Sequence, residues 1–99
     1  MLNINKETNG TGLVVTLGGR LDTTTAPELE SAIKESLDGV TELIVDCKEL
    51  EYISSAGLRV LLSAQKIMNK QGRMVIRNAS EEIKEIFDVT GFSDILTIE

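Results

Sequence analysis

The sequence predicts a single α/β domain with a mixed sheet of about five strands, an N-terminal antiparallel hairpin and three main helices. The chain has 99 residues, which is enough for one modest core and too few for two. Hydrophobic residues make up 41% of it, so one folded domain is expected over residues 1–99. After an opening pair of strands, strand-like and helix-like segments alternate strictly. Such alternation is typical of parallel strands joined by right-handed crossovers.

The N-terminal residues predict the hairpin. Leu2 and Ile4 indicate a first strand, and the apolar run Leu13–Leu17 indicates a second. Between them lies Asn9-Gly10, a strong turn signal because both residues tolerate positive φ. The two strands are therefore expected to pair antiparallel.

The stretch TTTAPELE, residues 23–30, predicts the start of the first helix. Thr25 and Glu28 have the spacing of a capping box, in which the Glu28 side chain reaches back to the Thr25 backbone N–H. Pro27 fits the first turn, where its missing N–H costs nothing. The apolar residues that then recur at helical spacing are Leu29, Ile33 and Leu37. Gly39 is expected to end the helix.

The rest of the chain alternates strand and helix. ELIVDC, residues 42–47, is a short apolar run typical of a central strand. The elements expected after it are a helix over about 56–69, a strand over 73–78, a helix capped by Ser80 and closed by Gly91, and a strand over 94–99.

Composition excludes several classes of function. The net charge of −6 disfavours binding to nucleic acid and insertion into anionic membranes, and it favours a partner with a basic contact face. The chain has no histidine, so it lacks the commonest general base and metal ligand, and we expect no metal site and no cofactor. Cys47 is the single cysteine and is expected to be buried. No signal peptide and no membrane span are recognisable, which predicts a soluble cytoplasmic protein.

Ser54 and Ser55 lie where the second helix is expected to begin. A serine at that position can cap the first backbone N–H groups of a helix, but one hydroxyl is enough for this. The second hydroxyl suggests a phosphate acceptor, because a helix N-terminus favours negative charge. Arg59 follows Ser55 by about one turn and could contact such a phosphate. Both interpretations, cap and acceptor, remain open from the residues alone.

The segment ELEYISSAGLRVLL (49–62), with ELIVDC before it and GGRLDTTTAPELE (18–30) upstream, resembles the STAS domain. More narrowly, it looks like the small single-domain bacterial anti-sigma factor antagonists, over essentially the whole chain. That resemblance implies partner switching. The unphosphorylated protein binds an anti-sigma factor that is also a serine kinase, and so frees a sigma factor. Phosphorylation by this kinase ends the binding, and a serine phosphatase restores it.

The resemblance also implies which residues act. The family's acceptor serine precedes a glycine by two positions, so Gly57 fixes the acceptor as Ser55, with Ser54 a less favoured second acceptor. Many members have an acidic residue where this chain has Ser54. The residues expected to contact the partner are Asp22, Thr23, Ser54, Ser55, Gly57 and Arg59. We expect Asp22 and Ser55 to lie close together, since both follow strand ends, and Asp22→Lys to weaken binding with little change in Tm.

The same residues also bear on other functions. A serine nucleophile would need a base, and without histidine we expect no enzyme activity. Gly18-Gly19 is not part of a nucleotide-binding pattern and is expected to permit a bend. The alternative role is that of a STAS accessory or scaffold subunit of a lipid-transport or stressosome-type complex without a phospho-switch. Val60 and Ile67 widen the apolar arc of the second helix, which indicates either a covering helix or a docking surface beside Ser55.

Overall fold

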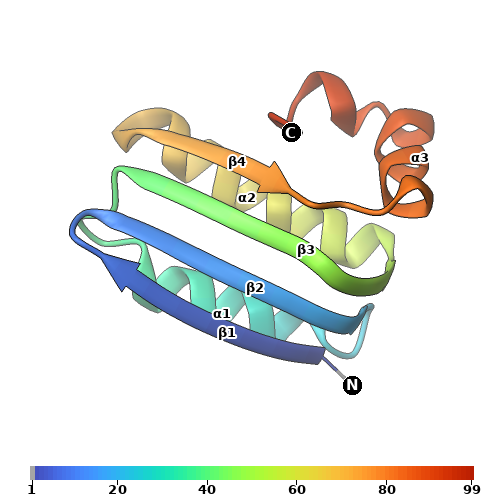
Figure 1. Cartoon of the computed structure of the whole chain (residues 1–99), viewed down its shortest axis with the longest axis horizontal. Coiled ribbons are helices and arrows are strands. Elements are labelled where there is room, and N and C mark those ends of the chain that lie inside the picture. Colours follow the sequence, from blue (N-terminus) through green and yellow to red (C-terminus); the bar gives the residue numbers. More distant parts are fainter. Residues whose placement is uncertain (1) are drawn as a thin grey trace.

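The computed structural model describes residues 2–99, which form one sheet with helices packed on it (Figure 1). The strands are β1 (Leu2–Asn9), β2 (Gly12–Leu21), β3 (Glu42–Ile53) and β4 (Arg73–Arg77). The helices are α1 (Ala26–Ser36), α2 (Ser55–Gln71), α3 (Glu81–Thr90) and the short 3-10 helix η1 (Phe92–Asp94).

The sheet is mixed, as the sequence predicts. Its strand order is β1-β2-β3-β4, with β1 antiparallel to β2 and the pairs β2–β3 and β3–β4 parallel. Helices α1 and α2 make the two crossovers between parallel neighbours, and Figure 1 shows both of them behind the sheet. Because both crossovers run in the same direction along the sheet, their helices cover the same face. The N-terminal hairpin and the three main helices are thereby confirmed.

The expected fifth strand over residues 94–99 is wrong. Only one parallel bridge, between Ile76 and Ile98, joins this segment to β4, so the described part of the chain has a four-stranded sheet. The turn after η1 explains the difference, because the N–H groups of Ile95 and Leu96 both donate to Phe92 O, at 3.0 and 2.8 Å. A backbone committed to these bonds cannot also join a ladder.

The hairpin turn consists of Gly10 and Thr11. Asn9 pairs with Gly12 and so still belongs to β1. Positive φ is needed only at Gly10, where it is +63°. A glycine with positive φ at the first of two turn positions is typical of a type II′ hairpin.

The capping box expected at Thr25 is wrong. Thr25 is the residue before α1, but its side chain makes no bond to the helix. Its hydroxyl instead accepts from Asp22 N at 2.8 Å and donates to Arg20 O at 2.9 Å. Asp22 organises the turn before α1: its carboxylate accepts from Thr25 N, the N–H that Glu28 would bind in a capping box, and its backbone carbonyl accepts from Ala26 N, the first N–H of the helix.

The two ends of α3 and the burial of the single cysteine agree with the predictions from the sequence. Ser80 Oγ accepts from Ile83 N at 3.2 Å, and Gly91 ends α3 with a φ of +82°. Cys47 is fully buried in the core. Burial, and then the neighbouring charge of Asp46, raise the pKa of the thiol to about 12.

Strand β3 is twice as long as ELIVDC alone predicts, with 12 residues. Its register with β2 shifts twice, once between Thr16 and Gly18 and once between Gly19 and Arg20. At each shift β3 has one residue more than β2, as in a β-bulge. Gly19 has a φ of +87°, which agrees with the expectation that the glycine pair permits a bend. Both strands consequently end together, with Leu21 paired to Ile53.

Candidate functional site at the mouth of helix α2

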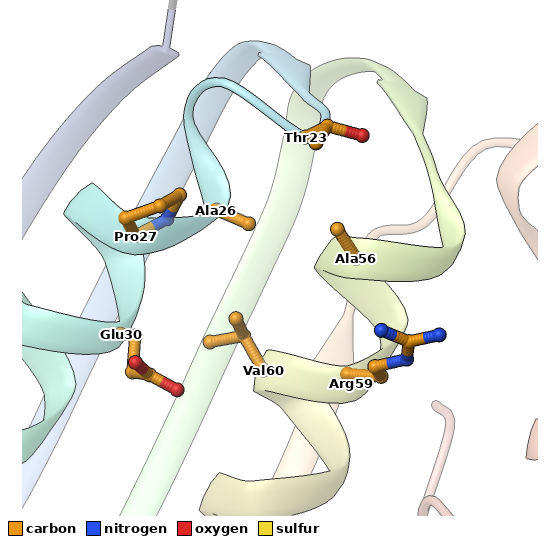
Figure 2. A pocket seen from close by; sticks show the side chains of 7 residues that line it. All are labelled: Thr23, Ala26, Pro27, Glu30, Ala56, Arg59 and Val60. Atoms are coloured by element: carbon orange, nitrogen blue, oxygen red, sulfur yellow. The ribbon is translucent and has the colours of Figure 1, made fainter.

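The ends of β2 and β3 bring two loops side by side. Ser54 N donates to Leu21 O at 2.9 Å, so a backbone hydrogen bond joins the last residue of β2 to the first residue after β3. Figure 2 shows the result, with Thr23 at the tip of one loop and Ala56 at the start of α2 facing the same opening. Asp22 and Ser55 thus follow the ends of two paired strands, which is the premise on which they are expected to lie close together.

Helix α2 begins at Ser55, one residue before the expected start. The bond from Leu58 N to Ser54 O, at 3.0 Å, is the first one that closes the helix. The N–H groups of Ser55, Ala56 and Gly57 precede it and have no acceptor within the helix. They give the mouth of α2 a positive potential, and the Ser55 hydroxyl lies beside them.

The two serines are in different environments. Ser55 is exposed, whereas Ser54 is half-buried and its Oγ is enclosed without a hydrogen-bond partner among the described residues. Ser54 also makes no capping bond to α2, so the cap interpretation is wrong for this hydroxyl. Of the pair, Ser55 therefore offers the hydroxyl that an external protein can reach.

Gly57 is buried, so it does not form part of the contact surface that the sequence suggested. A Cβ at this position would lie 2.6 Å from Leu21 Cγ and 3.0 Å from Ile53 Cγ1. Carbon atoms in contact are about 3.5–4 Å apart, so glycine is what allows α2 to approach the sheet this closely. Gly57 shapes the mouth of the helix from below.

The side chain of Asp22 organises its own loop. Asp22 Oδ1 accepts from Thr24 Oγ1 at 2.8 Å, from Thr24 N at 3.0 Å and from Thr25 N at 3.1 Å. These bonds, that of the Thr24 hydroxyl first, lower the pKa of the Asp22 carboxyl to about 2 against the opposing effect of desolvation. The expectation that Asp22→Lys changes Tm little did not include these bonds, which a lysine side chain cannot accept.

A cation–π pair that the sequence does not predict lies next to Asp22. The Arg20 guanidinium carbon lies 4.3 Å from the centroid of the Tyr52 ring, and Arg20 pairs with Tyr52 across the β2–β3 ladder. Arg20 Nε is also 3.7 Å from Asp22 Oδ2. The pairing depends on both register shifts, and no local pattern in the sequence reveals it. Arg20 and Tyr52 are exposed and extend the polar surface around the loop.

A shallow groove of about 200 Å³ separates the first turns of α1 and α2 (Figure 2). Its lining residues are Thr23, Ala26, Pro27, Glu30, Ala56, Arg59 and Val60. Val60 is buried between the helices, and Ile67 is partly buried against the core. Of the two explanations for the wide apolar arc of α2, this supports packing against a neighbouring helix. Arg59 is exposed, and within residues 2–99 it forms no ion pair.

Residues 2–99 contain no group of three or more side chains placed to hold a metal ion. None of the helices described in this range is long and apolar enough to cross a membrane. The chemistry available at the mouth of α2 is thus that of a hydroxyl, a helix N-terminus and a nearby guanidinium. These groups suit the acceptance of a phosphate and contact with another protein.

A four-stranded mixed sheet with an exposed serine at a helix mouth agrees with a domain of the STAS type. The STAS domain family model matches residues 3–99, and the chain belongs to this family. The chain is 30% identical to the anti-sigma-B factor antagonist of Bacillus subtilis over 98 residues, which are 98% of this chain and 90% of that protein. It is also 30% identical to the anti-sigma-B factor antagonist of Staphylococcus aureus over 99 residues, 98% of this chain and 92% of that protein.

Solved structures share the fold. An anti-sigma factor antagonist from Mycobacterium paratuberculosis superimposes with a TM-score of 0.89 at 23% identity, over 99% of this chain and 85% of that one. The antagonist SpoIIAA has been solved in an unphosphorylated and, for the Bacillus protein, a phosphorylated form. The unphosphorylated form has a TM-score of 0.77 at 19% identity, over 98% of this chain and 87% of that one. The phosphorylated form has a TM-score of 0.77 at 20% identity, over 98% of this chain and 91% of that one.

Proposed function

We propose that this protein is an anti-sigma factor antagonist that works by partner switching. In its unphosphorylated form it binds an anti-sigma factor that is also a serine kinase, and a sigma factor is released. The kinase phosphorylates Ser55, the complex separates, and a serine phosphatase restores the binding form. The protein acts in the cytoplasm, as a regulator without catalytic activity of its own. Relatives named as antagonists at 30% identity over nearly the whole chain support this proposal.

The observation that carries the proposal is the difference between the two serines. Ser55 is exposed at the first position of α2, while Ser54 Oγ is enclosed. A kinase must bring the hydroxyl to its nucleotide, which requires a side chain that projects from the surface. Ser55 meets this requirement without unfolding of the helix. Phosphorylation of Ser54 would require the β3–α2 junction to open first.

The proposed switch acts through the interface and needs no change of fold. A phosphate on Ser55 lies beside unpaired N–H groups and within a turn of Arg59, so the protein itself tolerates the charge. The penalty falls on the complex, because a group with close to two negative charges must lose water in an interface fitted to a small hydroxyl. A loss of about 3 kcal/mol would weaken binding by more than a hundredfold.

The partner surface in this proposal surrounds Ser55. It comprises Thr23 and Arg59 on either side of the groove and the loop that Asp22 holds in place. The hydrogen bonds within the loop use Oδ1 of Asp22. Its other oxygen, Oδ2, is approached only by Arg20 among residues 2–99. It can therefore contribute to binding both directly and by fixing the position of Thr23.

Phosphosite mapping after incubation with the kinase and ATP tests the proposal. The anti-sigma factor is first isolated by its affinity for the unphosphorylated protein. Phosphate is expected on Ser55, and Ser55→Ala is expected to hold the partner in the presence of ATP. Ser54→Ala, the matched control, should switch like the wild type. Phosphate on Ser54 alone would move the site by one residue. No phosphate, with binding indifferent to ATP, would instead favour an accessory or scaffold subunit of a transport or stressosome-type complex.

A further inference from the structure

Helix α3 is attached to the domain along one side only. Ile83 and Phe87 are buried and hold it to the core, while most of its other residues are exposed. Figure 1 shows α3 beyond the carboxyl end of β4, at the corner of the molecule, rather than on the face covered by α1 and α2. A large part of its surface is thus free to meet another molecule.

The net charge of the chain is concentrated in this region. The acidic residues from position 81 onward are Glu81, Glu82, Glu85, Asp88, Asp94 and Glu99, and Lys84 is the one basic residue. Six acidic groups against one lysine leave a charge of −5, out of −6 for the whole chain. Residues 1–80 are therefore almost electrically balanced. Because four of the six acidic residues lie on α3, a basic molecule approaching the domain is steered toward this helix.

One face of α3 combines this charge with exposed apolar surface. Glu82, Glu85, Ile86, Val89 and Thr90 line one shallow hollow and recur at helical spacing. Val89 is 79% exposed, compared with 49% for Ile95 and 37% for Tyr52, the other exposed large hydrophobic residues among positions 2–99. Lys84 lines an adjoining hollow with Glu81 and Asp88, and Glu82 and Glu85 line both hollows. The face formed by Glu82, Glu85, Ile86 and Val89, called the α3 face below, is therefore apolar at its centre and acidic at its edge, with Lys84 as the one basic residue beside that edge.

We propose that the α3 face binds a basic amphipathic helix of a partner protein. Apolar side chains of that helix would cover Ile86 and Val89, and its lysine or arginine residues would pair with Glu82 and Glu85. The acidic edge disfavours nucleic acid and anionic membranes as occupants. With ten residues, α3 is about 15 Å long, so the contact is small, weak and sensitive to salt. The α3 face shares no residue with the mouth of α2, so this inference does not depend on the proposed function.

Photo-crosslinking can identify the occupant. The photoreactive residue p-benzoyl-phenylalanine replaces Val89 in the full-length chain, and the same residue at the exposed Lys70 of α2 serves as control. After crosslinking in an extract of the source cells, the attached peptide is identified by mass spectrometry and synthesised. The expected product, formed at position 89 and not at position 70, is a partner segment with an apolar stripe flanked by basic residues.

Binding of that synthetic peptide then decides the proposal. Val89→Ser and the double variant Glu82→Lys/Glu85→Lys are expected to weaken it about tenfold or more, and so is an increase of NaCl from about 50 to about 500 mM. Ser55→Asp should bind it as the wild type does, which separates this surface from the switch. Equal crosslinking at both positions, an acidic or uncharged peptide, a crosslink to a second copy of this chain, or unchanged binding by the variants would each overturn the proposal.

Discussion

Gly57 of α2 rests directly on Leu21 of β2, with room for no further atom: a Cβ at position 57 would lie 2.6 Å from Leu21 Cγ. Leu21 is fully buried and cannot move aside without disturbing the core. This contact fixes the height of the helix mouth above the sheet, and therefore the position of Ser55.

Gly57→Ala is accordingly expected to destabilise the protein by about 1–3 kcal/mol, as overpacking of a core does. Urea unfolding measures the effect. The double variant Gly57→Ala/Leu21→Ala is the control, because the shortened side chain at position 21 removes the clashing atom. Its loss of stability should be smaller than the sum of the two single losses. Additive losses would show that the clash at Leu21 does not limit the packing of α2.

Ser54→Ala is expected to leave stability unchanged or to raise it by up to about 1 kcal/mol, because it removes a buried hydroxyl that has no partner. Ser80→Ala is the matched control at the start of α3, where the hydroxyl accepts from Ile83 N. Its loss should cost about 1 kcal/mol. Thermal unfolding of both variants compares the two helix starts. If Ser54→Ala costs as much as Ser80→Ala, the Ser54 hydroxyl has a partner in solution.

Asp22→Asn is expected to lower stability at neutral pH while keeping the shape of the side chain. The pKa of Asp22 is lowered from 3.8 to about 2 in the folded protein, so its carboxylate contributes stability that is complete above pH 3.8 and is lost as the pH falls toward 2. The difference between the wild type and the variant should shrink over this same range. Denaturant titrations between about pH 7 and about pH 2 measure it, with the exposed Asp38→Asn as control. A difference independent of pH would contradict the role of the charge.

The hydrogen bonds between Asp22 and its own loop also determine which variant can test the role of Asp22 in binding. Asp22→Lys would remove the acceptor of two backbone N–H groups, so a loss of binding could reflect a displaced loop. Asp22→Asn can still accept the hydrogen bonds of the loop through its amide oxygen, while it removes the charge and replaces the second oxygen by an NH2 group. Weaker partner binding by this variant, at a temperature where it remains folded, would be evidence for direct contact.

The sequence identified the position of Ser55 but not the separate environments of the two serines. A helix start after an apolar strand is visible in ISSAGL, and the resemblance to the family, through its spacing between acceptor serine and glycine, implies the second serine. Which hydroxyl turns inward depends on the bond between Ser54 N and Leu21 O, which joins residues 33 positions apart. Local patterns carry no information about such a contact.

Two other predictions failed because competing local arrangements fit the same residues. Thr25 and Glu28 have capping-box spacing, yet the carboxylate of Asp22 reaches the N–H groups of Thr24 and Thr25. Residues 94–99 have the composition of a strand, yet the N–H groups of Ile95 and Leu96 donate to Phe92 O in a turn. In both cases the bonds formed by the preceding loop decided the outcome, and composition alone does not rank these alternatives.

Phosphorylation of Ser55 is expected to stabilise the free protein while it weakens the complex. The phosphate would lie at the N-terminus of α2, and Arg59, one turn along, has no competing ion pair among residues 2–99. Together these interactions are expected to raise the free energy of unfolding of the phosphorylated protein by about 1 kcal/mol. For a domain of this size, that raises Tm by about 5 °C.

Protein carrying phosphoserine at position 55 permits the measurement, with thermal unfolding followed in low and high salt. The gain in Tm should fall in Arg59→Gln and persist in Lys66→Gln, which removes an exposed cation farther along the same helix. It should also decrease below about pH 6, where the phosphate loses one of its two charges. An equal gain in both variants would assign the effect to the helix N-terminus alone and remove Arg59 from the switch.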